Sequence, residues 1–298
     1  MKVYIADEAG FCFGVKRALN LIAQLNEKNQ NVQIFGQLIH NRTVLKNLEK
    51  KGIGYIESID ELDPGKTLVI RTHGIPKHVE NELRRKKIGI LDATCPFVKK
   101  IHRIVGKIDS GKSRVVIVGD GNHPEVIAAK SYTPDADVVN SMAEAKTIKK
   151  SKTIGVVAQT TLNSDFLKKI VAVLLDKAET IEIHNTICHA TRIRQEAIKK
   201  LAPEVDFVVV IGGKNSSNTR KLFEIASEKN PNTFLIEKSS DLHNLDFIER
   251  VNFFKSVGIT AGASTPPDEI ERVKDFFNNI ENIAKEIKNG RTKRNFQH

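Results

Sequence analysis

The sequence predicts an α/β protein in which three similar lobes, each built on a mostly parallel sheet, are related by approximate threefold symmetry. Three observations support this fold class. Each of the three cysteines stands between a short β-like run and an amphipathic helix, a strand ending in glycine follows each helix at a constant distance, and strands alternate with helices along the chain. A pattern that recurs three times indicates an internal repeat.

The first part of each repeat leads to a cysteine. Short β-like runs occupy 3–12, 89–95 and 181–188, and they end at Cys12, Cys95 and Cys188. Apolar residues then recur at helical spacing on one face of each predicted helix: Val15, Ala18, Ile22 and Leu25; Val98, Ile101, Val105 and Ile108; Ile193, Ala197 and Leu201. We therefore expect every cysteine to lie at the N-terminus of a helix.

The second part of each repeat is a strand that ends in glycine. These strands occupy 32–36, 115–119 and 207–212, and each terminal glycine lies 24 residues after its cysteine. A polar residue follows four positions after each glycine: His40, His123 and Ser216. Chance does not readily supply three matches at two fixed offsets, so the repeat is a strong prediction.

The third part is a strand that ends in a polar turn. The strands occupy 67–74, 153–161 and 257–264, and their turns lie around His73, Thr160 and Ser264. Helices are predicted to follow at 76–87, 164–178 and 266–280, where proline occupies a first turn in two cases. Because ligands gather beyond the carboxyl ends of parallel strands, we expect all these turns to converge on one centre. The alternative is that the three lobes keep similar turn residues only because folding requires them.

The last repeat lacks a final strand, and the N-terminal strand Val3–Ile5 is the obvious replacement. This closure predicts a first lobe at 13–95, a second at 96–188 and a third at 189–282, completed by residues 1–12. Residues 283–298 are predicted to form a solvated basic tail.

The composition fits a multi-lobed chain without disulfides. Its 298 residues exceed the usual domain of about 100–200, and an odd count of three cysteines favours a reducing compartment. No apolar run approaches the roughly 20 residues of a membrane span, and acids occupy the place of a signal peptide's apolar run. We expect a cytoplasmic protein with no membrane partner. The net charge of +11 predicts an anionic partner: nucleic acid, phosphate or an acidic protein.

Three cysteines at helix starts allow several chemistries. The helix dipole and the following basic residues favour thiolates, with lowered pKa values. A zinc ion could be held by the three cysteines and a histidine, either His189 or His123. A cubane iron–sulfur cluster would leave one iron without a protein thiolate. Three buried, inert cysteines are the remaining interpretation, which their matching positions in the repeat disfavour.

The polar turns predict a phosphate or diphosphate ligand. Neutral or cationic donors dominate them, together with amides at helix starts: His40, His73, His123, Ser216, Ser217, Asn218 and Ser264. Glu125 is the obvious carboxylate among these turns, and it would suit a proton donor. A solvated glutamate in a first helical turn is an equally good interpretation of its spacing.

Several segments resemble those of the 4-hydroxy-3-methylbut-2-enyl diphosphate reductase family, enzymes of the methylerythritol phosphate route to isoprenoids. They are AGFCFGVKRA, RTHGIP, DATCP, GDGNHPEV, AQTT, GGKNSSNTRKL and TAGAST, in this order between Cys12 and about Pro266. The resemblance implies a trefoil of three α/β lobes around a central cluster. It also implies a reductive dehydroxylation that yields isopentenyl and dimethylallyl diphosphate.

The resemblance further implies roles for individual residues. Cys12, Cys95 and Cys188 match the ligands of one [4Fe–4S] cluster with an open iron, and Glu125 matches the acid that delivers protons. The diphosphate-binding positions match His40, His73, Ser216, Asn218 and Ser264, with Ser217 in the same loop. His123 and Thr160 match residues near the substrate, whereas Thr191 receives no firm role. An acidic electron carrier, such as a ferredoxin or flavodoxin, is the implied protein partner.

Two other classes of protein compete with this enzyme hypothesis. A nucleic-acid-binding protein would explain the net charge of +11, but the sequence has no recognised binding motif and few aromatic residues for stacking on bases. A zinc-stabilised structural protein would explain the cysteines. We expect no nucleic-acid partner, because a diphosphate substrate and an acidic carrier account for the charge.

Overall fold

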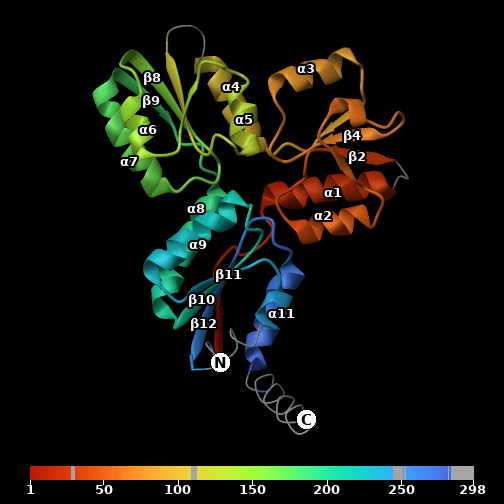
Figure 1. Cartoon of the computed structure of the whole chain (residues 1–298), viewed down its shortest axis with the longest axis vertical. Coiled ribbons are helices and arrows are strands. Elements are labelled where there is room, and N and C mark those ends of the chain that lie inside the picture. The colour runs from red at the N-terminus through yellow and green to blue at the C-terminus, as the bar shows by residue number, and fades with distance from the viewer. Residues whose placement is uncertain (28–30, 109–112, 244–250, 252, 281, 283–298) are drawn as a thin grey trace, which may run out of the picture. The chain divides into compact units, whose positions relative to one another are not determined.

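The computed structural model describes residues 1–27, 31–108, 113–243, 251, 253–280 and 282. The chain divides into two compact units, one of Met1–Phe11 with Ile193–His298 and the other of Cys12–Arg192. The first unit contains one sheet and the second contains two (Figure 1). The predicted basic tail at 283–298 lies outside the described residues.

Three four-stranded parallel sheets share one strand order, which confirms the α/β fold class. The order β3-β2-β4-β5 joins Tyr55–Ile56, Val32–Phe35, Thr67–Ile70 and Ile90–Asp92. The order β7-β6-β8-β9 joins Asp137–Val139, Arg114–Val118, Ser151–Ala158 and Ala178–His184. The order β11-β10-β12-β1 joins Thr233–Ile236, Phe207–Ile211, Ser256–Ala261 and Lys2–Ile5.

The N-terminal strand occupies the place that the repeat leaves open. β1 lies parallel to β12, with Lys2 opposite Ser256 and Ile5 opposite Ile259. It is therefore the counterpart of β5 and β9, which complete the other two sheets. The boundaries of three lobes at 13–95, 96–188 and 189–282 remain a proposal that this shared order supports.

The strand register refines one detail of the predicted repeat. Phe35 pairs with Ile70, Val118 with Ala158 and Ile211 with Ala261, so the strands before and after each glycine turn correspond one to one. Counting onward from these pairs makes Thr161 the counterpart of His73, and Thr160 the counterpart of Thr72. The turn predicted around Thr160 therefore contains the counterpart of His73, and that counterpart is Thr161.

Each cysteine immediately precedes a helix, as its sequence context predicts. The helices are α1 (Phe13–Glu27), α4 (Pro96–Ile108) and α8 (His189–Leu201). The carbonyl groups of the three cysteines accept the first helical hydrogen bonds, from the amides of Lys16, Lys99 and Arg192 at 2.9–3.1 Å. The cysteines thus occupy the N-cap positions.

The remaining helices flank the sheets. They are α2 (Arg42–Glu49), α3 (Lys77–Arg85), α5 (Pro124–Lys130), α6 (Met142–Thr147), α7 (Ser164–Leu174), α9 (Ser217–Lys229) and α11 (Pro267–Asn278). The helices predicted at 76–87, 164–178 and 266–280 are present with shorter ends. α7 stops because its predicted last turn tightens into a 3₁₀ turn over Leu175–Lys177. None of the described helices is long and apolar enough to cross a membrane.

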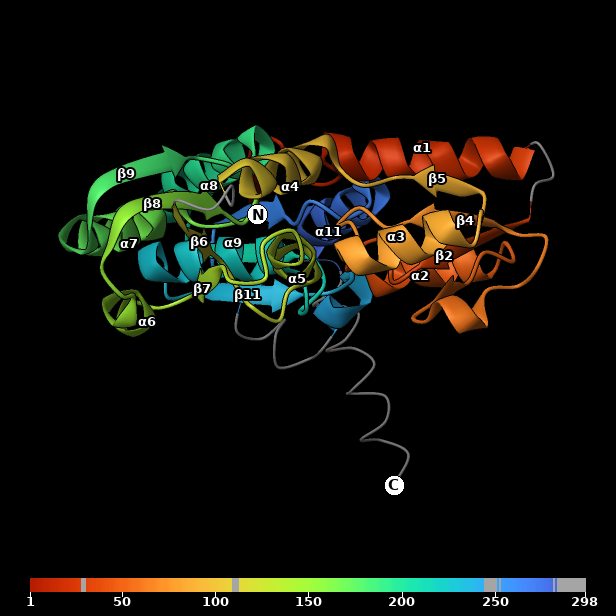
Figure 2. The ribbon, with the colours of Figure 1, turned by 90° about the horizontal axis from the view of Figure 1, so that it is seen from above.

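Each face of the second sheet is covered by helices. Val115 and Ile117 of β6 point into a core with Ile101 of α4 and Val126 of α5. Val116 and Val118, on the opposite face, pack with residues of α6 and α7. Because both faces are buried, β6 is apolar throughout rather than alternating, as parallel sheets require. Figure 2 shows these helices around the sheet from a second direction.

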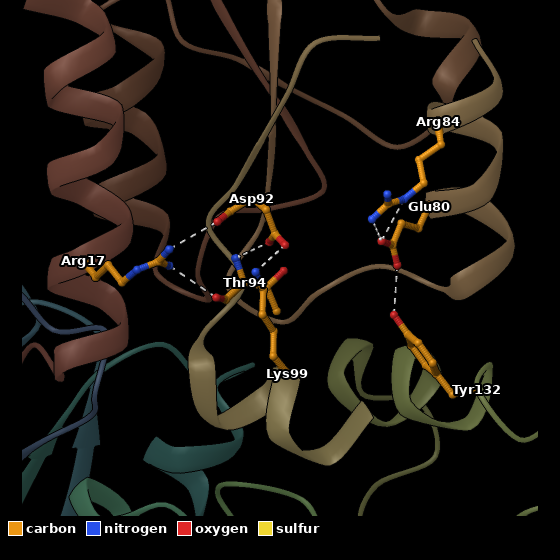
Figure 3. A network of polar contacts seen from close by, with 7 residues as sticks. All are labelled: Arg17, Glu80, Arg84, Asp92, Thr94, Lys99 and Tyr132. Carbon is orange, nitrogen blue, oxygen red and sulfur yellow. Dashed lines mark hydrogen bonds and ion pairs between the residues drawn. The ribbon is translucent and has the colours of Figure 1, made fainter. Parts of the chain in front are cut away.

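A polar network braces α3 against the turn that follows α5 within the Cys12–Arg192 unit (Figure 3). The Tyr132 hydroxyl donates to Glu80 Oε2 at 3.0 Å, while Arg84 binds Glu80 Oε1 at 2.7 Å. Tyr132 also stacks on the buried His102 of α4, with ring centroids 4.6 Å apart. The network therefore joins the segment after the His73 turn to the helices of the second sheet.

Replacing Tyr132 with Phe is expected to lower the free energy of unfolding by about 1–2 kcal/mol, because a hydrogen bond to a carboxylate is lost while the ring stack remains. Chemical denaturation measures the change. Tyr4→Phe is the matched control, since Tyr4 is 46% exposed and should change stability by less than about 0.5 kcal/mol. Equal stabilities of Tyr132→Phe and the unmodified protein would contradict the bracing role.

Candidate active site

The three cysteines come together at the starts of α1, α4 and α8. A Cβ atom built on Gly14 would lie 2.9 Å from the Sγ of Cys95 and 3.8 Å from that of Cys12. Cys188 is close enough to Cys12 for the two thiols to affect each other electrostatically. All three cysteines are free of disulfides and partly buried. Gly14 is therefore the residue whose missing side chain leaves room beside the sulfurs.

The thiols of Cys95 and Cys188 do not have the lowered pKa values that their helix positions predict. Burial raises the pKa of Cys95 to about 11, although amides of the first turn donate to its sulfur. Burial also raises the pKa of Cys188, against hydrogen bonds from Thr191, whose Oγ1 lies 3.0 Å from Sγ. Desolvation outweighs the helix dipole here. Thr191, which had no predicted role, therefore holds the sulfur of the third cysteine through its amide and its hydroxyl group.

Two main-chain hydrogen bonds tie cysteines to the neighbouring polar turns. The amide of Cys95 donates to the Thr72 carbonyl and the amide of Cys188 donates to the Thr160 carbonyl, both at 3.0 Å. Thr72 in turn donates through Oγ1 to the Leu38 carbonyl at 2.8 Å, which links the turns of His40 and His73. The sequence interpretation missed Thr72. Its position next to His73 and its correspondence to Thr160 in the repeat could have indicated it.

Three histidines form a compact group in the same unit. The ring centroids of His40 and His73 lie 4.5 Å apart, and those of His123 lie 5.4 and 5.2 Å from them. Burial lowers the pKa of His73 well below its ordinary value, and the neighbouring His40, His123 and Arg71 lower it further. At neutral pH His73 is therefore an uncharged imidazole. Its buried Nδ1 has no hydrogen-bond partner among the described residues.

The arrangement of His123 favours an anion over a metal ion in this group. One nitrogen from each ring lies within 4.8 Å of the others, a spacing that could hold a metal. However, Nδ1 of His123 accepts the Glu125 amide at 3.2 Å, as the N-cap of α5. A neutral His123 then carries its proton on Nε2, which becomes a donor rather than a lone pair. Such donors suit the oxygens of a phosphate.

Glu125 is a buried carboxyl group rather than a solvated one. Its side chain is 2% exposed, so the alternative of a solvated first-turn glutamate is wrong. Thr160 donates to both carboxyl oxygens, from its amide at 2.6 Å and from Oγ1 at 2.7 Å. Burial nevertheless raises the pKa of Glu125 to about 7. This carboxyl group can therefore hold or release a proton near neutral pH.

The other predicted polar residues lie in the unit of Met1–Phe11 and Ile193–His298. Ser216 is the N-cap of α9, and its Oγ accepts the Thr219 amide. Ser217 and Asn218 are buried in the first turn of that helix, and Ser264 is buried after β12. The Nδ2 of Asn218 is buried without a hydrogen-bond partner among the described residues. An unused donor at a helix start is the expected chemistry of an anion site.

A comparison with known protein families identifies the family of this chain. Residues 3–278 match the sequence profile of the LytB protein family. The chain belongs to the LytB family.

Relatives of this LytB chain include two bacterial proteins named 4-hydroxy-3-methylbut-2-enyl diphosphate reductase. The protein of Aquifex aeolicus (strain VF5) is 42% identical over 283 residues, which cover 93% of this chain and 96% of the relative. That of Thermoanaerobacter sp. (strain X514) is 44% identical over 278 residues, covering 92% and 95%. The relatives thus match almost the full length of the chain.

Solved structures match the LytB chain over a similar extent. A structure described as (E)-4-hydroxy-3-methyl-but-2-enyl diphosphate reductase, the terminal enzyme of the non-mevalonate pathway, has a TM-score of 0.68 at 42% identity and covers 93% of this chain and 99% of that one. The E-1-hydroxy-2-methyl-but-2-enyl-4-diphosphate reductase from Plasmodium falciparum has a TM-score of 0.86 at 28% identity, covering 92% and 87%. Both agree with the fold described above.

Replacing Glu125 with Gln is expected to remove a pH dependence of stability. The carboxyl pKa rises from its ordinary value of 4.5 to about 7 on folding, so the folded LytB chain binds more protons in this range. The free energy of unfolding of the unmodified protein should therefore fall as pH rises from about 4.5 to about 7. Gln does not titrate and should lack this part of the fall.

Chemical denaturation across this pH range measures the difference. Glu228→Gln, at an exposed glutamate of α9, serves as the control and should follow the unmodified protein. Parallel pH profiles for Glu125→Gln and the unmodified protein would show that the carboxyl group does not titrate as its burial requires.

Proposed function

We propose that this LytB chain is a 4-hydroxy-3-methylbut-2-enyl diphosphate reductase. The substrate takes up two electrons and two protons, its allylic C–O bond breaks, and water leaves to give isopentenyl or dimethylallyl diphosphate. The observation that carries the proposal is the convergence of three N-cap cysteines. Main-chain bonds tie two of them, Cys95 and Cys188, to turns near the imidazole donors and the buried, protonatable carboxyl group. The names of its relatives support the same activity.

Cys12, Cys95 and Cys188 are the proposed ligands of one [4Fe–4S] cluster. Their sulfurs fit this group because they lie close together without disulfides and because the absent side chain of Gly14 leaves space beside them. The chain has only these three cysteines, so one iron would have no protein thiolate. When bound, the cluster supplies single electrons and an iron with Lewis-acid character.

The diphosphate is proposed to bind the group of His40, His73 and His123. Neutral imidazoles donate N–H groups to phosphate oxygens. An arriving anion would also raise the lowered pKa of His73 and favour its protonation. Ser216, Ser217, Asn218 and Ser264 are proposed diphosphate ligands in the other unit. The unused Nδ2 of Asn218 and the amides at the start of α9 support this role.

Glu125 is proposed to supply a proton to the leaving hydroxyl group. A carboxyl group with a pKa of about 7 is substantially protonated at neutral pH. Thr160 holds both of its oxygens, so the carboxyl group is fixed before substrate arrives. The Thr160 hydroxyl can pass the proton onward, because it bonds Glu125 on one side and can accept or donate on the other.

The electrons are proposed to come from an acidic protein such as a ferredoxin or flavodoxin, to which the net charge of +11 is complementary. The three free cysteines also support a reducing, cytoplasmic location, because a cluster requires reduced thiols. Nucleic acid is not needed to explain the charge.

Anaerobic reconstitution followed by reduction of the diphosphate substrate tests the proposal. We expect about four irons and four sulfides per chain, together with formation of both products. Stoichiometric zinc in a colourless protein would favour the zinc-stabilised alternative. Tight, steeply salt-dependent binding of RNA or DNA without turnover would favour the nucleic-acid alternative.

Replacing Glu125 with Gln should lower kcat by about 10²–10⁴-fold, because the amide retains the contacts with Thr160 but cannot donate an acidic proton. Iron and sulfide contents should not change. Turnover of the reconstituted variant measures the loss, with Glu228→Gln as a control of unchanged activity. Retention of most activity by Glu125→Gln would refute the proposed proton role.

Replacing Cys188 with Ser should remove or cripple the cluster, because a serine hydroxyl group is a poor substitute for a thiolate ligand. Iron and acid-labile sulfide after anaerobic reconstitution measure the effect. Thr191→Ser is the matched control, since it keeps a hydroxyl group beside the Cys188 sulfur and should retain full iron. Unchanged iron in Cys188→Ser would exclude Cys188 as a ligand.

A further inference from the structure

The first turns of the three cysteine-capped helices carry an unfavourable charge. α1, α4 and α8 have no acidic residue in the first turn. Basic residues follow the cysteines instead: Lys16 and Arg17, Lys99 and Lys100, and Arg192. A cation at a helix N-terminus opposes the helix dipole and so destabilises the helix. Because basic residues recur at all three helix starts although they are unfavourable there, we infer that they serve a role other than helix stability.

Most of this positive charge is not neutralised by the chain. Lys16, Lys100 and Arg192 are exposed and have no ion-pair partner among the described residues. Arg17 donates only to the main-chain carbonyls of Asp92 and Thr94 (Figure 3). Lys99 is the exception, with Asp92 Oδ2 at 2.5 Å. Lys16, Lys100 and Arg192 are therefore available to ion-pair with an acidic partner.

Exposed aromatic rings accompany these cations. Phe13 follows Cys12 directly and is 61% exposed, and Phe97 lies two residues after Cys95 and is 40% exposed. Exposed aromatic side chains of this size are typical of interaction surfaces rather than of ordinary solvated helices. Since the cysteine sulfurs lie together, the two rings lie at the start of neighbouring helices. α1 and α4 also lie in one layer of their unit in Figure 2.

We propose that Phe13, Lys16, Phe97, Lys100 and Arg192, here called the cysteine rim, form the docking surface for a small acidic redox protein that delivers electrons. This inference rests on the proposed function. Each rim residue lies in the first turns of a helix that begins at a proposed cluster ligand. Closeness to the cluster matters because electron transfer slows steeply with distance. Interfaces for electron transfer are small and transient, with an apolar centre and a charged border that steers the encounter. The rim provides both features.

The reaction fixes what the partner must do. Each turnover consumes two electrons, so a carrier of one electron docks twice, and its oxidised form must leave between the two transfers. A weak interface governed by charge meets this requirement better than a large apolar one. The partner's own reduced centre supplies the electrons, while the protons come from the chain and solvent.

Charge reversal of the rim tests the inference. In the reconstituted holoenzyme, the triple substitution Lys16→Glu, Lys100→Glu and Arg192→Glu should raise the KM for reduced flavodoxin by roughly tenfold to a hundredfold at low salt. It should also flatten or invert the dependence of that rate on ionic strength. Turnover driven by dithionite and methyl viologen should be retained, because these small reductants need no protein interface.

The control is a second triple substitution with the same change in net charge. Lys146, Lys150 and Lys169 line a separate surface groove beside α6 and α7, and their replacement by Glu should leave the flavodoxin KM within about twofold of the unmodified value. Equal effects of the two triple variants would show a general charge effect and overturn the rim as a specific site.

A variant that preserves charge distinguishes the aromatic contacts in the docked complex from the electrostatic attraction that guides the partner. Phe13→Ala with Phe97→Ala should raise the flavodoxin KM while keeping the salt dependence of the unmodified protein. An unchanged KM in both the aromatic and the charge-reversed variants would refute the docking surface. Failure of the unmodified holoenzyme to turn over with dithionite and viologen would instead refute the proposed function itself.

Discussion

Two amide-to-carbonyl hydrogen bonds organise the chemistry-bearing loops of the Cys12–Arg192 unit. They join Cys95 to Thr72 and Cys188 to Thr160. Where parallel strands end, their amides and carbonyls lose strand partners and must find others. Here an amide in the loop after one strand donates to a carbonyl in the loop after the neighbouring strand. Cys95, Cys188, the His73 turn and the Glu125–Thr160 pair are therefore positioned by bonds at the ends of the sheet strands.

Burial then sets the charge state of this region. It raises the pKa of Glu125 to about 7 and lowers that of His73 well below its ordinary value. Both groups are driven toward their neutral forms, so the protein supplies donors and a transferable proton without a large fixed charge. Exposed cations lie instead near the starts of α1, α4 and α8, at Lys16, Lys100 and Arg192, where they can act on an approaching partner.

The features that sequence could predict are those determined locally. Cysteine positions, glycine turns and amphipathic helices follow from neighbouring residues, and the repeat made even the replacement strand β1 predictable. The pKa direction of Cys95 was not predictable, because helix position argues for lowering whereas burial, a property of the folded chain, raises it. That Thr72 and Thr160 are counterparts likewise depends on the strand register, which pairing between strands fixes and local sequence does not.

The pairing of β1 with β12 has a consequence for biosynthesis. The sheets of β2–β5 and β6–β9 are each completed from contiguous chain as it emerges from the ribosome. β1 is made before both of these sheets, yet its partner residues, from Ser256 onward, are made after them. Such a distant pairing is slow to form because a long loop must close. β1 therefore stays unpaired while the chain of the other two sheets is made, and its own sheet can be completed only after β12 has been synthesised.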